Sequence, residues 1–179
     1  MKITWISAIL SILAVSVLEI PLFSSGTIKQ FKLGSGLTLH LAVDSQWNCS
    51  FLKKENKESE FYITNNLNKK EKCRIYVIPA EKNPTDDDLI SIMKMNGAAL
   101  LKKSVEKEFT FTPLPGGNGR YYILTDSSPK PGEAVLISRG AVSSGRHLVL
   151  FTFLFDQSDS PFFQSLLNTI SSIKITPPE

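Results

Sequence analysis

A run of nine residues near the C-terminal end constrains the fold more than any other feature, because His147–Phe155 (HLVLFTFLF) is almost entirely apolar. As a β-strand from Leu148 onward, it would have two apolar faces: Val149, Phe151, Phe153 and Phe155 on one, and Leu148, Leu150, Thr152 and Leu154 on the other. Such a strand needs cover on both sides. We therefore predict that it lies in the middle of a sheet, with helices on one side and more of the chain on the other.

The residues that follow predict a helix that could supply part of this cover. Ser160 can cap a helix through its hydroxyl, and Pro161 suits the first helical position. The helix, expected over 160–172, has one apolar stripe, formed by Phe162, Phe163, Leu166, Leu167 and Ile170. Residues 173–176 predict a final edge strand before Pro177 and Pro178.

The N-terminus has the pattern of a secretory signal. Met1 and Lys2 precede an apolar stretch from Ile3 to Leu18, interrupted only by Thr and Ser among apolar residues. We interpret residues 1–25 as a signal peptide or an N-terminal anchor and therefore expect export. An uncleaved segment would be the chain's only contact with a membrane.

Residues 26–179 are expected to form a single domain. Residues 1–25 hold one Lys and one Glu, so the domain keeps the net charge of +3 of the whole chain. A domain of about 150 residues can bury roughly two thirds of its unfolded surface and needs no metal to fold. Its lysine clusters include acidic residues and lack alternating aromatics, which argues against a nucleic-acid-binding role.

The middle of the chain predicts short strands broken by turns. Residues 36–43 alternate with Leu37, Leu39, Leu41 and Val43 inward and His40 outward. Three further strands follow, each with one inward face: Trp47, Cys49 and Phe51; Phe61 and Ile63; and Cys73, Ile75 and Val77.

A second helix is predicted over 86–104. Its buried face would carry Leu89, Met93 and, at a point of close approach to the sheet, Gly97. Asp86, Asp87 and Asp88 suit its positive end better than a calcium loop, which needs ligands at alternating positions and a glycine at the bend.

Further strands are predicted over 108–112, with Phe109 and Phe111 inward, and over 120–126 and 133–143. The glycines of 113–119 lack the Gly-Lys-Ser/Thr ending of a phosphate loop. Strands with inserted helices predict an α+β domain: a mainly antiparallel sheet covered by two helices.

The layout of Leu37–Ile175 resembles the PsbP-like fold, which is shared by the extrinsic photosystem II protein, a Ran-binding nuclear import factor and exported bacterial proteins of the DcrB type. Two segments carry the resemblance. Gly36–Trp47 (GLTLHLAVDSQW) is similar to the family's opening strand and its tryptophan, and Phe162–Ile173 is similar to the closing helix. The resemblance implies a binding or assembly-support module without catalysis.

We therefore expect an exported, non-enzymatic accessory protein, periplasmic or secreted, that binds another envelope or secreted protein and needs no cofactor. One alternative is a small-ligand or lipid-binding module with an apolar pocket between sheet and helices. Another is a small hydrolase, whose candidates are base His40 or His147, nucleophile Ser138 or Ser144, and acid Asp126 or Asp156. No Gly-x-Ser-x-Gly motif surrounds any serine, and the two His and two Cys lack metal-ligand spacing.

Cys49 and Cys73 form a candidate disulfide, because export places both in a compartment where a bridge could persist. If the strand of Phe61 lies between their strands, the cysteines stand about 9.6 Å apart, or two strand spacings. Bridged Cα atoms normally lie within about 7 Å. The bridge is therefore expected only if the two cysteine strands are direct neighbours.

Overall fold

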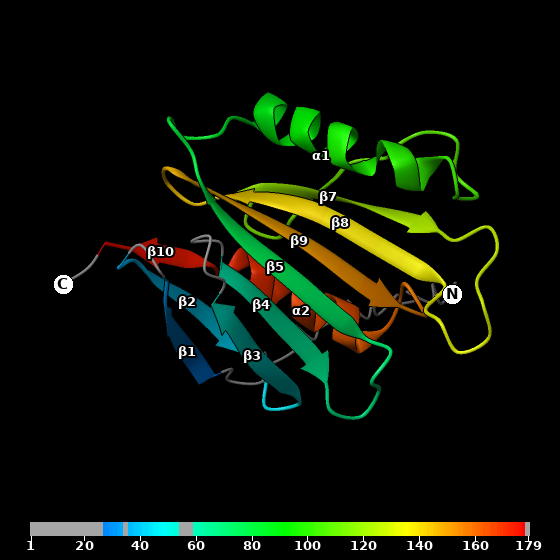
Figure 1. The fold of residues 1–179 in the computed structure, drawn as a ribbon, viewed down its shortest axis with the longest axis horizontal. Helices are drawn as coiled ribbons and strands as arrows, with labels where there is room; N and C mark the ends of the chain where they lie inside the picture. The colour runs from blue at the N-terminus through cyan, green and yellow to red at the C-terminus, as the bar shows by residue number, and fades with distance from the viewer. Residues whose placement is uncertain (1–26, 34–35, 54–58, 178–179) are drawn as a thin grey trace, which may run out of the picture.

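The computed structural model describes residues 27–33, 36–53 and 59–177. The predicted signal segment, residues 1–25, lies outside them. The described chain forms two antiparallel sheets and two helices in three layers, with helix α1 above the larger sheet in Figure 1 and helix α2 behind it. The predicted α+β class is confirmed.

The larger sheet has seven strands in the order β3-β4-β5-β9-β8-β7-β6, with every neighbouring pair antiparallel. Its strands are β3 (Trp47–Lys53), β4 (Ser59–Asn65), β5 (Lys72–Pro79), β6 (Thr112–Pro113), β7 (Gly119–Thr125), β8 (Leu136–Ser143) and β9 (His147–Phe155).

Strand β9 lies in the middle of this sheet, as its apolar faces predict. It pairs along its length with β5 and β8. Val149, Phe151, Phe153 and Phe155 are buried on the face toward α2, which we call the inner face. The face toward α1, the outer face, is only partly covered: Leu148 is buried, whereas Leu150, Thr152 and Leu154 are half-buried.

The inner face packs against α2 (Pro161–Ser171) and a smaller sheet. The smaller sheet has the order β1-β2-β10, with β1 (Thr27–Lys32), β2 (Thr38–Val43) and β10 (Lys174–Thr176). Helix α2 begins as predicted, since the Ser160 hydroxyl accepts the N–H of Phe162 and Pro161 is the first helical residue. Phe163 stacks on Phe155 with ring centroids 4.5 Å apart, so the main core lies between the two sheets and this helix.

The sequence predicts a single sheet, but the described residues form two. Strand β1 was not predicted, because Thr27–Lys32 mixes Lys and Gln with few apolar residues. It pairs with β2, whose inward residues Leu39, Leu41 and Val43 are buried as predicted. Strand β10 is an edge strand, as predicted, but of the smaller sheet.

Helix α1 (Asp86–Leu101) lies over β7 and β8 on the outer face (Figure 1). Thr85 and Asp88 form a capping box at its start, and Asp86, Asp87 and Asp88 lie in its first turn, at the positive end for which the sequence predicts them. The helix ends three residues before the predicted 104, because the Ser104 hydroxyl donates to the carbonyl oxygens of Leu101 and Glu106 and the chain turns there.

The predicted strand over 108–112 is absent; only Thr112 and Pro113 pair with β7. Pro113 has no N–H to extend the ladder. Phe109 and Phe111 instead pack on Tyr122, with ring centroids 4.7 and 6.0 Å away. The alternating Phe109 and Phe111 are therefore part of a small second core beneath α1, and not of a strand.

Candidate functional site

The residues predicted for a hydrolase do not come together as a base, a nucleophile and an acid. His147 begins β9 and Asp156 follows its end, which places them roughly 30 Å apart along the strand. Asp126 also lies at the Asp156 end, because it follows Thr125, which aligns with Leu136 and through it with Phe155. Neither acid can orient this histidine.

The two serines differ in position. Ser138 aligns with Phe153, about 20 Å along β9 from His147, and its buried hydroxyl has no partner within the described chain. Ser144 exchanges backbone hydrogen bonds with His147 in the β8–β9 turn. His40 lies in the smaller sheet, where its ring contacts the Thr176 hydroxyl at 3.0 Å. The described residues therefore contain no assembled triad from these candidates.

Metal ligands do not gather either. Among the described residues no group of three or more His, Cys, Asp or Glu side chains could hold an ion. Asp86 instead accepts hydrogen bonds from Arg120, at 2.8 and 3.1 Å from Nε and at 2.7 Å from Nη2, and these lower the pKa of its carboxyl group.

Cys49 and Cys73 are both free. Strand β4 lies between their strands, and both cysteines align with Ile63 from opposite sides. The predicted condition for a bridge, direct neighbourhood of the two strands, is therefore not met. Cys73 is fully buried, and burial raises the pKa of its thiol.

The phenylalanines of the inner core, among the described residues, pack on one another where the sequence predicts a possible ligand pocket. The rings of Phe153, Phe155 and Phe163 stack with centroids 4.5 to 5.9 Å apart and fill the space between β9 and α2. Hollows and exposed polar side chains occur instead on the outer face of the larger sheet.

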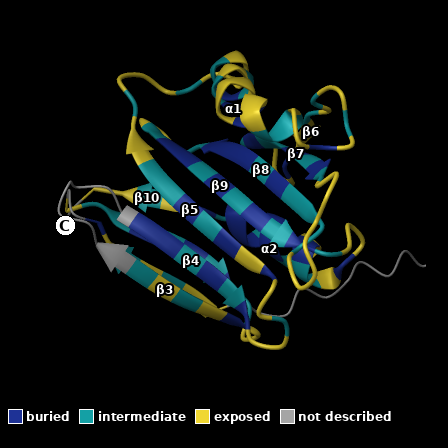
Figure 2. Ribbon diagram, turned by 45° about the vertical axis from the view of Figure 1, so that its right-hand side comes forward, coloured by how far each residue is buried: buried dark blue, intermediate teal, exposed yellow. Residues whose placement is uncertain are grey.

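Beyond α1, the outer face over β4, β5 and β9 has no covering element among the described residues (Figure 2). We call this area the open face and define it by Glu60, Tyr62, Arg74, Tyr76, Leu150 and Thr152. The register aligns Tyr62 with Arg74 and Arg74 with Thr152, and in the next row it aligns Glu60 with Tyr76 and Tyr76 with Leu150. Six side chains from three strands thus form one continuous surface.

Arg74 is held at the centre of the open face. Its Nη2 donates to Glu60 at 2.7 Å, and its guanidinium lies 4.5 Å from the Tyr76 ring centroid and 5.7 Å from that of Tyr62. The Tyr62 hydroxyl also donates to Glu60, at 2.7 Å, which raises the pKa of Tyr62. The Glu60 side chain is 2% exposed and that of Arg74 is 42% exposed, so the pair presents its cation to solvent.

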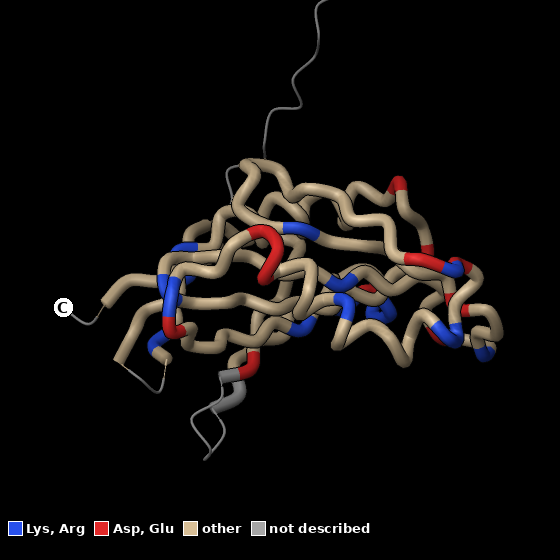
Figure 3. Tube along the Cα trace, turned by 90° about the horizontal axis from the view of Figure 1, so that it is seen from above, with Lys and Arg blue, Asp and Glu red and all other residues tan. Residues whose placement is uncertain are grey.

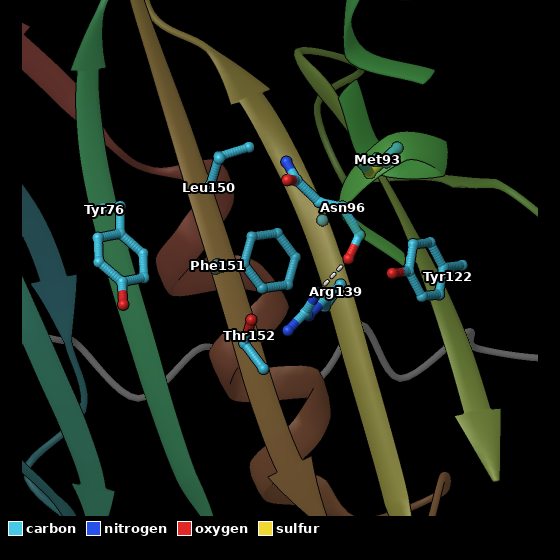
Figure 4. A pocket seen from close by; sticks show the side chains of 9 residues that line it. Tyr76, Met93, Asn96, Tyr122, Arg139, Leu150, Phe151 and Thr152 are labelled. Carbon is cyan, nitrogen blue, oxygen red and sulfur yellow. Dashed lines mark hydrogen bonds between the residues drawn. The ribbon is translucent and has the colours of Figure 1, made fainter. Parts of the chain in front are cut away.

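A cavity of about 200 Å³, which we call the α1 cavity, lies where the open face meets α1 (Figure 4). It is lined by Tyr76, Met93, Asn96, Tyr122, Arg139, Gly140, Leu150, Phe151 and Thr152. The register continues the row of the open face into it, since Thr152 aligns with Arg139 and Arg139 with Tyr122.

Two polar groups in this cavity lack partners within the described chain. Arg139 donates through Nη1 to the Asn96 carbonyl oxygen at 2.6 Å, but its Nε is buried without a hydrogen bond. The Tyr122 hydroxyl is also buried and unsatisfied. Burial raises the pKa of Tyr122, and the nearby Arg139 guanidinium opposes that rise without meeting the hydroxyl in good hydrogen-bonding geometry.

Acidic and basic residues are mixed along the chain when the molecule is viewed from above (Figure 3).

None of the described helices is long and apolar enough to cross a membrane. Arg74, Arg139 and Tyr122 belong to no local sequence motif, because strand and turn signals do not show which polar side chains of different strands come together.

No protein-family model matches the chain. A search of curated proteins also found no match. Among solved structures, the chain is similar to the solution structure of cyanobacterial PsbP (CyanoP) from Synechocystis sp. PCC 6803, with 13% sequence identity and a TM-score of 0.47. The match covers 84% of this chain and 93% of that one.

Proposed function

We propose that the chain is an exported, non-catalytic accessory protein that binds another envelope or secreted protein through the open face. The observation that carries this proposal is the Arg74 cluster: a surface guanidinium between two tyrosine rings, fixed from below by a buried carboxylate. Tyrosine and arginine dominate the energetic centres of protein interfaces.

The open face is suited to binding because it is organised in advance. Side chains on hydrogen-bonded strands lose less freedom on binding than side chains on loops, and Arg74 already has its rotamer fixed by Glu60. The described chain places no second helix over this area, in contrast to the α2 side of the sheet.

Charge indicates the kind of partner. The exposed charges of this face are cationic, because the Glu60 side chain is buried and the exposed Lys72 continues the Arg74 face of β5. The whole chain carries a net charge of +3. We expect a protein partner that presents carboxylates, since complementary potentials favour encounter and register.

Site-specific photocrosslinking in the native envelope tests the open face. A crosslinking amino acid at position 76 should capture one defined protein, and the same residue at position 95 should not, because Met95 is exposed on α1. Lys72→Glu combined with Tyr76→Ala should reduce capture from a neighbouring open-face position, 62, at least tenfold. Lys102→Glu, an exposed charge reversal just after α1, is the matched control.

Equal capture from positions 76 and 95, or capture that the open-face variants leave unchanged, would contradict the proposed surface. Export is tested separately by fractionation and N-terminal sequencing of the isolated chain. A chain found in the cytoplasm with residues 1–25 intact would refute the exported role while leaving the binding surface untouched.

A further inference from the structure

The α1 cavity combines features that the protein-binding role does not use. Its guanidinium, Arg139 of β8, has no carboxylate partner within the described chain, whereas Arg74 of β5, on the other side of β9, is neutralised by Glu60. A guanidinium with an unused buried Nε is a donor that favours an oxyanion.

Tyr122 supplies an independent indication of a ligand. The residue is 0% exposed and its hydroxyl has no hydrogen-bond partner in the described structure. Leaving a buried hydroxyl unsatisfied is destabilising, because the group has lost its hydrogen bonds to water and gained none in the protein. Figure 4 shows this hydroxyl directed toward β8, on the side where Arg139 lies. A ligand oxygen that accepts from both groups would satisfy both.

The size and walls of the cavity indicate the rest of the ligand. Met93, Leu150 and the Tyr76 ring supply apolar surface, and Thr152 adds a hydroxyl beside Arg139. A dry cavity of about 150 Å³ can hold a benzene ring, so about 200 Å³ has room for a ring or a short chain with one charged group. Asn96 is exposed and Thr152 and Tyr76 are half-buried, so the cavity is open to solvent past these residues.

We propose that the α1 cavity binds a small monocarboxylate with an apolar body, such as an aromatic or short aliphatic acid. Arg139 binds the carboxylate, Tyr122 donates its hydroxyl to a carboxylate oxygen, and Met93 and Leu150 contact the apolar part. A monoanion matches the lining, because Arg139 is the only charged residue among the nine that form it. The site does not depend on the protein partner proposed above.

Calorimetric titration of the full chain with benzoate and hexanoate tests this assignment, with benzyl alcohol and inorganic phosphate as comparison probes. Benzoate or hexanoate should bind at least tenfold more tightly than benzyl alcohol, which has a similar apolar body but no carboxylate. Phosphate should bind more weakly than either acid, because the cavity has one cation and apolar walls. Equal binding of acid and alcohol, or tighter binding of phosphate, would overturn the proposal.

Two variants separate recognition from folding. Arg139→Gln should weaken benzoate binding at least tenfold. Tyr122→Phe should weaken it about fivefold while leaving the free energy of unfolding unchanged or higher, because it removes a hydroxyl without a partner. Lys94→Gln, an exposed change on α1, should leave binding unaltered. Benzoate affinity that survives both cavity variants would overturn the assignment. Binding of a peptide through its C-terminal carboxylate, without any binding of benzoate, would also overturn it.

Discussion

Gly97 permits the close contact between α1 and β7. A Cβ atom at this position would meet the Tyr122 hydroxyl oxygen and would lie 2.9 Å from two ring carbons of Phe109. Neither neighbour can easily move, since Tyr122 is fully buried and packs on Phe109. The sequence prediction of a close approach at Gly97 is thus confirmed. Glycine is needed there because the Tyr122 hydroxyl, which also lines the α1 cavity, occupies the space that a Cβ atom would take.

We predict that Gly97→Ala destabilises the protein by about 1–2 kcal/mol. Alanine would gain about 1 kcal/mol in helix propensity, but overpacking a buried site costs about 1–3 kcal/mol, and the bulk of the clash lies against groups that cannot relax. Urea unfolding of both proteins measures the change. In a Tyr122→Phe background the loss should be smaller, because the closest neighbour of the new methyl group is gone. A stabilising Gly97→Ala would show that α1 can shift away from the sheet.

The residues of the candidate site show where sequence reasoning stops. Arg74 stands in β5, which α1 and β6 separate in the sequence from Tyr122 in β7 and Arg139 in β8. They share one row only because the register aligns each with its neighbour through Thr152 of β9. Alternation within one strand predicts which face a residue occupies, but it does not predict the alignment of strands that are distant in the chain.

At the scale of elements, long periodic segments were predictable, whereas some short segments were not. Strand β9 and helix α2 followed from their apolar patterns, cap and proline. The segment 108–112 has the same alternation as a strand, but Phe109 and Phe111 bury their rings against Tyr122 without backbone pairing. Alternation therefore indicates burial of side chains. Backbone pairing with another strand depends on neighbours that the local sequence does not specify.

The order β3-β4-β5 decides the chemistry of the two cysteines, and we predict two free thiols per chain in the denatured, unreduced protein. Strand β4 keeps Cys49 and Cys73 about two strand spacings apart, beyond the reach of a disulfide. In the native protein the Cys73 thiol should react slowly with a thiol reagent, because it is fully buried and burial raises its pKa. Thiol titration with and without prior reduction should give the same count; no free thiol at unchanged monomer mass would contradict the strand order.

For the whole molecule, the two faces of β9 carry unequal cores. The inner core joins both sheets and α2 around Phe153, Phe155 and Phe163. The outer core is smaller and holds α1 mainly through Leu89 and Met93 against β7 and β8. Elements with fewer buried apolar contacts open at lower free energy. The protein should therefore open locally at α1, beside the α1 cavity, before it unfolds as a whole.

Native-state hydrogen exchange with Phe163→Ala tests this order. Removing a stacked core ring should cost about 3–5 kcal/mol, so the exchange free energies of β9 and α2 amides should fall by that amount, since they exchange through global unfolding. The α1 amides should start lower in the wild type and remain unchanged in the variant, because their local opening leaves Phe163 in place. If α1 and α2 amides lost protection together, the helix would belong to the main cooperative unit, and the cavity beneath it could not admit a ligand by local opening.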